Sequence, residues 1–192
     1  MRVSTDWLYP RFTWRQGLGM MGFGLVGAGI AGAYGILHDQ VTFTLSPEYF
    51  THFKFDQFDY LDDALSPRVR VAQIGFLATW WVGFFAGWFM GRVTLPHLPA
   101  ATAARQALRA VSVMLGLALA SGLAGGVFAP QNPDRLQAWQ AFLDLRGVTD
   151  PAAFVRVGWI HNGSYLGALL GLIIALLWLR RGRHQGSSTQ AK

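Results

Sequence analysis

Four long uncharged stretches restrict the fold of this chain more than any other feature of its sequence. They lie between Arg15 and His38, Arg70 and Arg92, Arg109 and Asp134, and Arg156 and Arg180. His161 is the one residue in these stretches whose side chain can carry a charge near neutral pH. Each has roughly twenty residues or slightly more, which lets a helix cross a hydrocarbon core about 30 Å thick. The sequence therefore predicts an all-α protein, a four-helix transmembrane bundle with short amphipathic helices on its outer face.

The expected spans divide the chain into one membrane domain and a short tail. We predict spans at about 16–37, 71–91, 110–130 and 157–179, with outer loops at 38–70 and 131–156. Together they form a single integral membrane domain, residues 1–183, followed by a disordered basic tail at 184–192.

The composition agrees with a protein surrounded by lipid. Only 14% of the 192 residues are charged, against about 25% in soluble domains. The chain has no cysteine, which excludes disulfides, thiolate metal sites and a cysteine nucleophile.

The distribution of charge predicts the orientation. The first outer loop carries three basic and six acidic residues, and the second carries three of each. The other three segments between and beyond the spans hold ten basic residues and one acid. Because Lys and Arg favour the cytoplasmic side, we expect a protein of the bacterial inner membrane with both termini in the cytoplasm. The net charge of +6 is then a topology signal, and no nucleic-acid partner is expected.

One alternative concerns the first span. Ala31-Gly32-Ala33 follows a basic leader and an apolar stretch, as a signal-peptide cleavage site does. The leader is long and aromatic, and the apolar stretch continues beyond Ala33, which favours a retained span. Cleavage after Ala33 remains the second interpretation.

The first span contains GLGMMGFGLVGAGIAG, with three overlapping copies of G-x-G-x-x-G. A dinucleotide site needs a strand before the glycines and an acid about twenty residues later, and neither pattern is present. In lipid, small residues instead let helix backbones approach closely, so these faces are expected to bind other helices, protein partners or a second copy. The predicted packing residues are Gly24, Ala28 and Gly32 in the first span and Gly75, Thr79 and Gly83 in the second. The predicted lipid-facing residues of the second span are Trp81, Phe84, Phe85 and Trp88.

The first outer loop combines an alternating segment with a helix start. Val41, Phe43 and Leu45 alternate with polar residues, which predicts a short extended piece. Ser46-Pro47-Glu48 is typical of a helix N-terminus, and the apolar pattern that follows predicts an amphipathic surface helix. A second outer helix is expected from Asn132-Pro133 to Gly147.

Three carboxylates, Asp56, Asp59 and Asp63, would share one face of the first outer helix. They are either a divalent-cation site or an acidic face in contact with solvent. The small number of oxygen ligands favours the second interpretation.

Two segments of this region, HDQVTFTLSPEYFTHFKFDQF and GFLATWWVG, resemble segments of a group of uncharacterised bacterial multi-pass membrane proteins. The resemblance covers the first two spans and their loop. It implies a membrane location and no particular activity, cofactor or site.

The last span contains GWIHNGSYLGALLG, with His161 at membrane depth and Tyr165 on the same helix face. His38 closes the first span on the same side, within reach of His161. An ionisable residue at this depth is a candidate functional site. His38 and His161 would suit a haem b iron, whereas His161 with Tyr165 would suit a quinone or a proton relay. The third interpretation is a histidine that only hydrogen-bonds a neighbouring helix.

Enzyme motifs such as H-E-x-x-H, G-x-S-x-G and the Walker sequence do not occur. The acids are expected in loops and in the N-terminal segment, which leaves no carboxylate pair for transport or acid–base chemistry. The sequence therefore favours a non-catalytic, partner-binding subunit or assembly factor. The alternative is a membrane redox protein that binds haem b or a quinone through His38 and His161.

Overall fold

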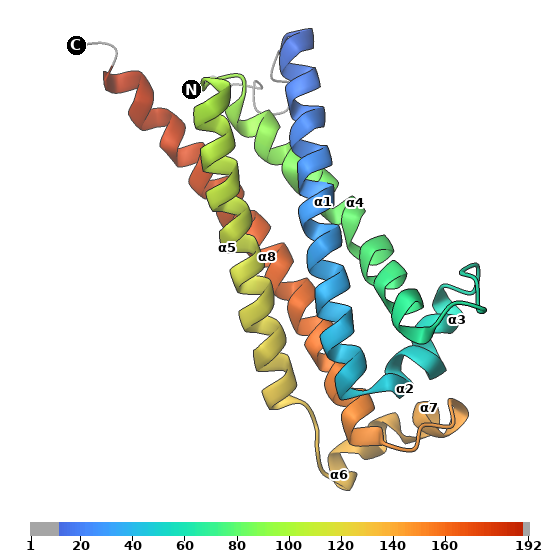
Figure 1. Cartoon of the computed structure of the whole chain (residues 1–192). Helices are drawn as coiled ribbons and strands as arrows, with labels where there is room; N and C mark the ends of the chain where they lie inside the picture. Colours follow the sequence, from blue (N-terminus) through green and yellow to red (C-terminus); the bar gives the residue numbers. More distant parts are fainter. Residues whose placement is uncertain (1–11, 190–192) are drawn as a thin grey trace.

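The computed structural model describes residues 12–189, in which every regular element is a helix (Figure 1). Four helices are long and apolar enough to cross a membrane. They are α1 (Trp14–Leu45), α4 (Pro67–Thr94), α5 (Ala100–Phe128) and α8 (Pro151–Thr189). The predicted all-α bundle with four candidate spans is therefore confirmed.

The four long helices form two hairpins. α1 packs along α4, and α5 packs along α8, while contacts between the two hairpins are far fewer. The start of α1 and the end of α8 lie at one end of the bundle, and the short helices lie at the other (Figure 1). We call the end with the short helices the outer end.

Two groups of short helices cover the outer end. The first group joins α1 to α4 and consists of α2 (Pro47–Tyr49), the π-helical turn Phe50–Lys54 and α3 (Phe55–Gln57). The second joins α5 to α8 and consists of α6 (Pro133–Leu136), the 3-10 turn Gln137–Trp139 and α7 (Gln140–Leu145). Gly147, the predicted stop of the second group, has a φ of 63°, a backbone conformation that favours glycine.

The predicted extended piece around Val41 is wrong, because α1 continues to Leu45. α1 ends at Leu45 because Ser46 takes the extended conformation favoured before a proline, and Pro47 begins α2. Within this extension Thr42 is buried, and its hydroxyl donates to the carbonyl oxygen of His38 at 3.1 Å. The longer helix places Asp39 inside α1 instead of in a loop.

The first outer helix is also shorter than predicted. Its α3 segment ends at Gln57, and residues 58–66 form turns up to the start of α4. Asp59 and Asp63 therefore do not share a helix face with Asp56. The Ser46 side chain makes no cap hydrogen bond.

Glycines bring the backbones of α1 and α4 into direct contact, along a line that we call the α1–α4 seam. A Cβ atom added to Gly27 would overlap the carbonyl oxygen of Gly83, and one added to Gly35 would overlap that of Gly75. Thr79 strengthens the same seam, since its hydroxyl donates to the carbonyl oxygen of Ala31 at 2.8 Å.

Two further glycines of the predicted face, Gly24 and Gly32, pack against aromatic rings instead. Gly24 leaves room for the Phe84 ring, and Gly32 leaves room for the Phe76 ring. The expectation that Phe84 faces lipid is therefore wrong, because its ring fills the space that Gly24 leaves empty. Trp81 and Phe85 are half exposed on α4.

The second hairpin is built in the same way. A Cβ atom at Gly163 would overlap the Ser121 carbonyl oxygen, and one at Gly167 would overlap that of Leu117. The closest glycine faces of both hairpins are thus occupied within the chain.

Candidate functional site

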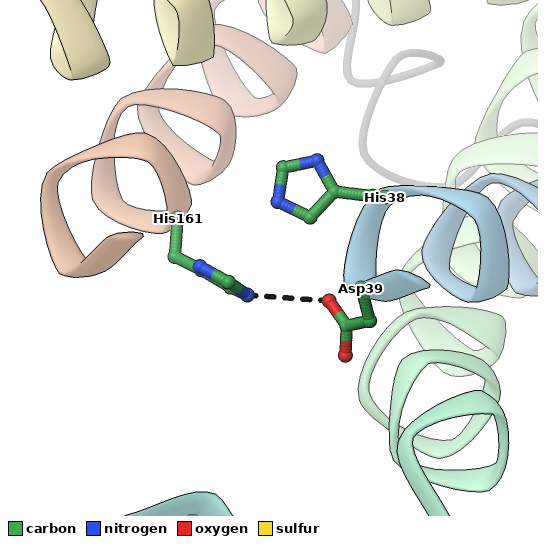
Figure 2. A group of neighbouring side chains, drawn as sticks. All are labelled: His38, Asp39 and His161. Carbon is green, nitrogen blue, oxygen red and sulfur yellow. Dashed lines mark hydrogen bonds and ion pairs between the residues drawn. The ribbon is translucent and has the colours of Figure 1, made fainter. Parts of the chain in front are cut away.

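Three ionisable side chains from the two hairpins converge near the outer end (Figure 2). His38 and Asp39 come from α1, and His161 comes from α8. One potential ligand atom from each lies within 4.8 Å of the other two. His161 is 2% exposed and Asp39 is 5% exposed, so water screens their interaction little. We call these three residues the polar centre.

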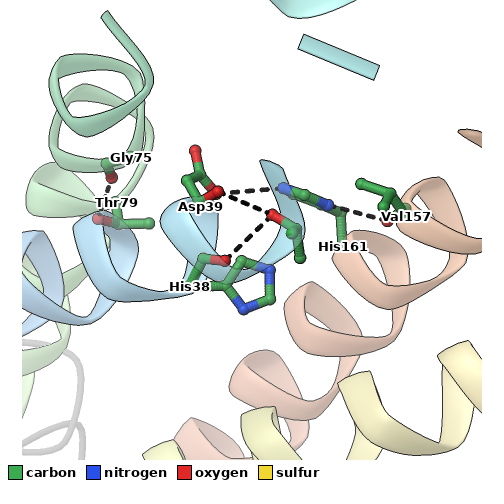
Figure 3. Close-up of polar contacts among 7 residues, drawn as sticks. His38, Asp39, Gly75, Thr79, Val157 and His161 are labelled. Atoms are coloured by element: carbon green, nitrogen blue, oxygen red, sulfur yellow. Dashed lines mark hydrogen bonds and ion pairs between the residues drawn. The ribbon is translucent and has the colours of Figure 1, made fainter. Parts of the chain in front are cut away.

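The orientation of His161 is held by hydrogen bonds at both ring nitrogens (Figure 3). Nδ1 lies 2.9 Å from the carbonyl oxygen of Val157, one turn earlier in α8. A carbonyl oxygen only accepts, so Nδ1 carries a proton and donates it. Nε2 lies 3.2 Å from Oδ1 of Asp39.

The contact between Nε2 of His161 and Oδ1 of Asp39 requires one shared proton. The pair is either an imidazolium beside a carboxylate or a neutral imidazole beside a carboxylic acid. Both states contain the same number of protons.

His38 is held by ring contacts and not by a hydrogen bond to its Nε2 atom. Its ring meets the His161 ring edge to face, with the centroids 4.8 Å apart, and stacks on Tyr34 at 5.6 Å. Nε2 of His38 is buried and has no hydrogen-bond partner. Tyr34 and Ser164 add two buried hydroxyl groups, close enough to interact with each other.

Aromatic rings of the first outer group cover the polar centre. The Tyr49 ring stacks on His161 with a centroid distance of 4.9 Å, and Phe50 lies at 6.1 Å. Burial raises the pKa of the Tyr49 hydroxyl well above its ordinary value, so Tyr49 stays protonated.

Lys54 places its ammonium group over the Tyr49 ring, 5.9 Å from the centroid. Burial lowers the pKa of Lys54, and the charge of Asp39 partly opposes this shift.

Polar contacts hold the two outer groups together above the polar centre. Arg146 forms an ion pair with Asp56 and donates to the carbonyl oxygen of His52 at 3.2 Å. The Glu48 carboxylate accepts from the backbone N–H groups of Thr149 at 3.1 Å and Asp150 at 2.9 Å. Burial opposes the charge of Glu48, but these hydrogen bonds prevail and lower its pKa.

The structure separates the predicted site residues into three sets. It brings His38 and His161 into contact. Tyr165 lies 6.1 Å from His161 by ring centroids but is 48% exposed on the side of the bundle. Asp56 pairs with Arg146. Among residues 12–189, only the polar centre groups three metal-binding side chains.

Asp39 is the functional candidate that sequence reasoning missed. The expectation that Asp39 lies in the outer loop is wrong, because it is buried within α1. The available signal was its position next to His38. The sequence places Asp39 in a loop, because a charged residue normally ends an apolar span.

The geometry also bears on the haem hypothesis. Two axial histidines must leave space for a flat macrocycle between them. The His38 and His161 rings are in edge-to-face contact, with their centroids only 4.8 Å apart. No macrocycle fits between these rings without separation of α1 from α8.

Comparison with protein-family models, curated proteins and solved structures finds no match for this chain.

Proposed function

We propose that this chain is a multi-pass protein of the bacterial inner membrane, with both termini in the cytoplasm. We further propose that it works as a non-catalytic subunit or assembly factor of a membrane complex and holds a ligand at the polar centre. The observation that carries this proposal is the buried His161–Asp39 pair beside a His38 nitrogen that has no partner.

The orientation is supported by charge and architecture together. The ends of α1 and α8 that adjoin the termini lie at one end of the bundle, where the basic excess is found. Lys and Arg near span ends favour the cytoplasm, and the mixed-charge short helices then face the periplasm. Cleavage after Ala33 is disfavoured, because it would remove Gly27 and Ala31 from the α1–α4 seam.

A purely structural role explains the polar centre poorly. One hydrogen bond between His161 and a neutral partner would be enough to link the two helices. Here an acid and a second histidine are also buried, and an unsatisfied buried polar atom costs about 1–3 kcal/mol. Binding of a ligand to the free nitrogen and the carboxylate would offset that cost.

A second candidate is a quinone-linked redox protein. It is supported by Tyr165, whose ring is exposed on the side of the bundle and lies near His161. A quinone approaching from lipid would meet Tyr165 first and His161 behind it. Direct contact with Asp39 would require displacement of the histidine pair.

The test compares the ligands and proteins that co-purify with wild type and with variants from native membranes. Wild type and His161→Ala are purified in mild detergent, with Asn162→Ala as the control on the exposed side of α8. Metal content, quinone content and co-purifying proteins are measured for each. We expect wild type and Asn162→Ala to carry a ligand that His161→Ala lacks. Identical content in all three would exclude a ligand at the polar centre, and an isolated monomer without partners would exclude the subunit role.

A further inference from the structure

We infer that the polar centre binds one divalent transition-metal ion through His38, Asp39 and His161. This inference rests on the proposal that the centre holds a ligand, and it names the chemical class of that ligand.

The donor set selects the class of ion. Two imidazole nitrogens and one carboxylate oxygen suit Zn²⁺, Fe²⁺ and related first-row ions. Ca²⁺ and Mg²⁺ prefer sets made of oxygen alone, so two histidines disfavour them. The ion would bring two positive charges beside the one buried carboxylate, and it would give the free His38 nitrogen a partner.

The spacing of the donors is close to what an ion needs. With metal–ligand bonds of about 2.0–2.2 Å in a tetrahedron, neighbouring ligand atoms lie about 3.3–3.5 Å apart. Nε2 of His161 and Oδ1 of Asp39 are already separated by 3.2 Å. The His38 nitrogen completes the group within 4.8 Å, so a modest movement of one ring would bring all three donors onto one ion.

The contacts behind the donors also match a metal site. A histidine that binds a metal through one nitrogen usually donates its other N–H to a carbonyl or carboxylate oxygen. His161 does this through Nδ1 and Val157, which leaves Nε2 pointing at Asp39. The same bond fixes the tautomer that a metal requires at Nε2.

The free His38 nitrogen is the independent observation. It is buried without a partner while the other two donors hold each other. Three protein donors leave one position of a tetrahedral ion open, as in sites that bind water or a substrate. The hydroxyl groups of Tyr34 and Ser164 lie beside the two histidines on their helices and would be available to a water bound there.

The experiment uses the full chain with a tag that contains no histidine. The purified protein is treated with a chelator, exchanged into metal-free detergent buffer and titrated with Zn²⁺ by calorimetry. We expect one ion per chain. His38→Ala, Asp39→Asn and His161→Ala should each weaken binding at least tenfold. His97→Ala and Asp63→Asn remove a histidine and an acid far from the centre and should bind as wild type does.

Co²⁺ and Cu²⁺ provide a readout on the wild-type chain if a variant fails to fold. Bound Co²⁺ should show the intense visible bands of a four-coordinate site. Bound Cu²⁺ should show magnetic coupling to two imidazole nitrogens. The metal site would be overturned if the ions did not bind stoichiometrically, or if Co²⁺ gave an octahedral spectrum and Cu²⁺ showed no coupling to nitrogen. It would also be overturned if His97→Ala and His38→Ala weakened Zn²⁺ binding equally.

The two proposals fail in different ways. If wild-type protein carries a quinone that His161→Ala lacks, and binds neither Zn²⁺ nor Co²⁺, the metal inference is wrong and the ligand-binding function stands. If no ligand of any kind depends on His161, both are wrong.

Discussion

Nε2 of His161 lies 3.2 Å from Oδ1 of Asp39, although 122 positions separate the two residues in the chain. Asp39 belongs to the first hairpin and His161 to the second, and contacts between α1 and α8 are otherwise few. This polar pair therefore links the two hairpins near the outer end, beneath Tyr49 and Phe50. Loss of this pair should therefore weaken the packing of the two hairpins against each other.

We expect Asp39→Ala to lower the free energy of unfolding in detergent by about 1–3 kcal/mol, because Nε2 of His161 would stay buried without a partner. Asp39→Asn should lose less, since its amide N–H can donate a hydrogen bond to Nε2 of the neutral imidazole. Thermal unfolding followed by circular dichroism measures both. Asp63→Ala, an exposed site, is the control, and an equal loss there would contradict the role of the pair.

Even one methyl group added at Gly27 should destabilise the packing of α1 against α4. The added Cβ atom would overlap the Gly83 carbonyl oxygen, and overpacking of this kind costs about 1–3 kcal/mol. Gly29→Ala is the matched control on the same helix, since its Cβ atom would meet nothing within 4 Å. We expect Gly27→Ala to unfold at a lower temperature and Gly29→Ala to be as stable as wild type or slightly more stable. Equal stability of the two variants would contradict close backbone contact.

The second hairpin offers an equivalent test. In Gly167→Ala the methyl group would overlap the Leu117 carbonyl oxygen, whereas in Gly116→Ala it would meet nothing within 4 Å. We expect a loss of about 1–3 kcal/mol for the first variant and none for the second. Cysteine pairs across α5 and α8 should also cross-link less efficiently in Gly167→Ala. Unchanged cross-linking and stability would argue against this packing.

Glu48 should make the stability of the outer groups depend on pH. Hydrogen bonds from Thr149 and Asp150 lower its folded pKa below the usual value of 4.5 despite burial. Its contribution is therefore complete above about pH 4.5 and is lost as the pH falls through the lowered folded pKa. We expect wild type to lose stability on acidification over this range by more than Glu48→Gln does. At pH 7 the variant should be weaker by about 1 kcal/mol, since this carboxylate is partly exposed to solvent. Parallel pH profiles would contradict the prediction.

The absence of cysteine makes the orientation directly measurable. Ala64→Cys lies in an exposed turn at the outer end, and Ala101→Cys lies exposed near the start of α5 at the opposite end. A thiol reagent that does not cross membranes should label Ala64→Cys in cells with a permeable outer membrane. It should label Ala101→Cys only after lysis. The reverse pattern would place the termini outside.

Much of the fold is readable from the sequence, because span formation is a local property. Each of the four stretches is long and apolar enough to cross a membrane by itself, whichever helix it later meets. The positions of Pro47 and Pro67 likewise mark helix starts, since proline is tolerated in a first helical turn.

The pairing of helices and the polar centre depend on tertiary structure. The glycines of α1 are spread around the helix, and only contact with α4 selects Gly27 and Gly35 as the closest points. Asp39 reads as a loop acid in the sequence, because a charge at the edge of an apolar stretch normally ends it. The long α1 helix and its approach to α8 bury Asp39 beside His161. Helix periodicity describes one helix at a time, whereas a site between helices depends on their relative rotation and depth, which only packing determines.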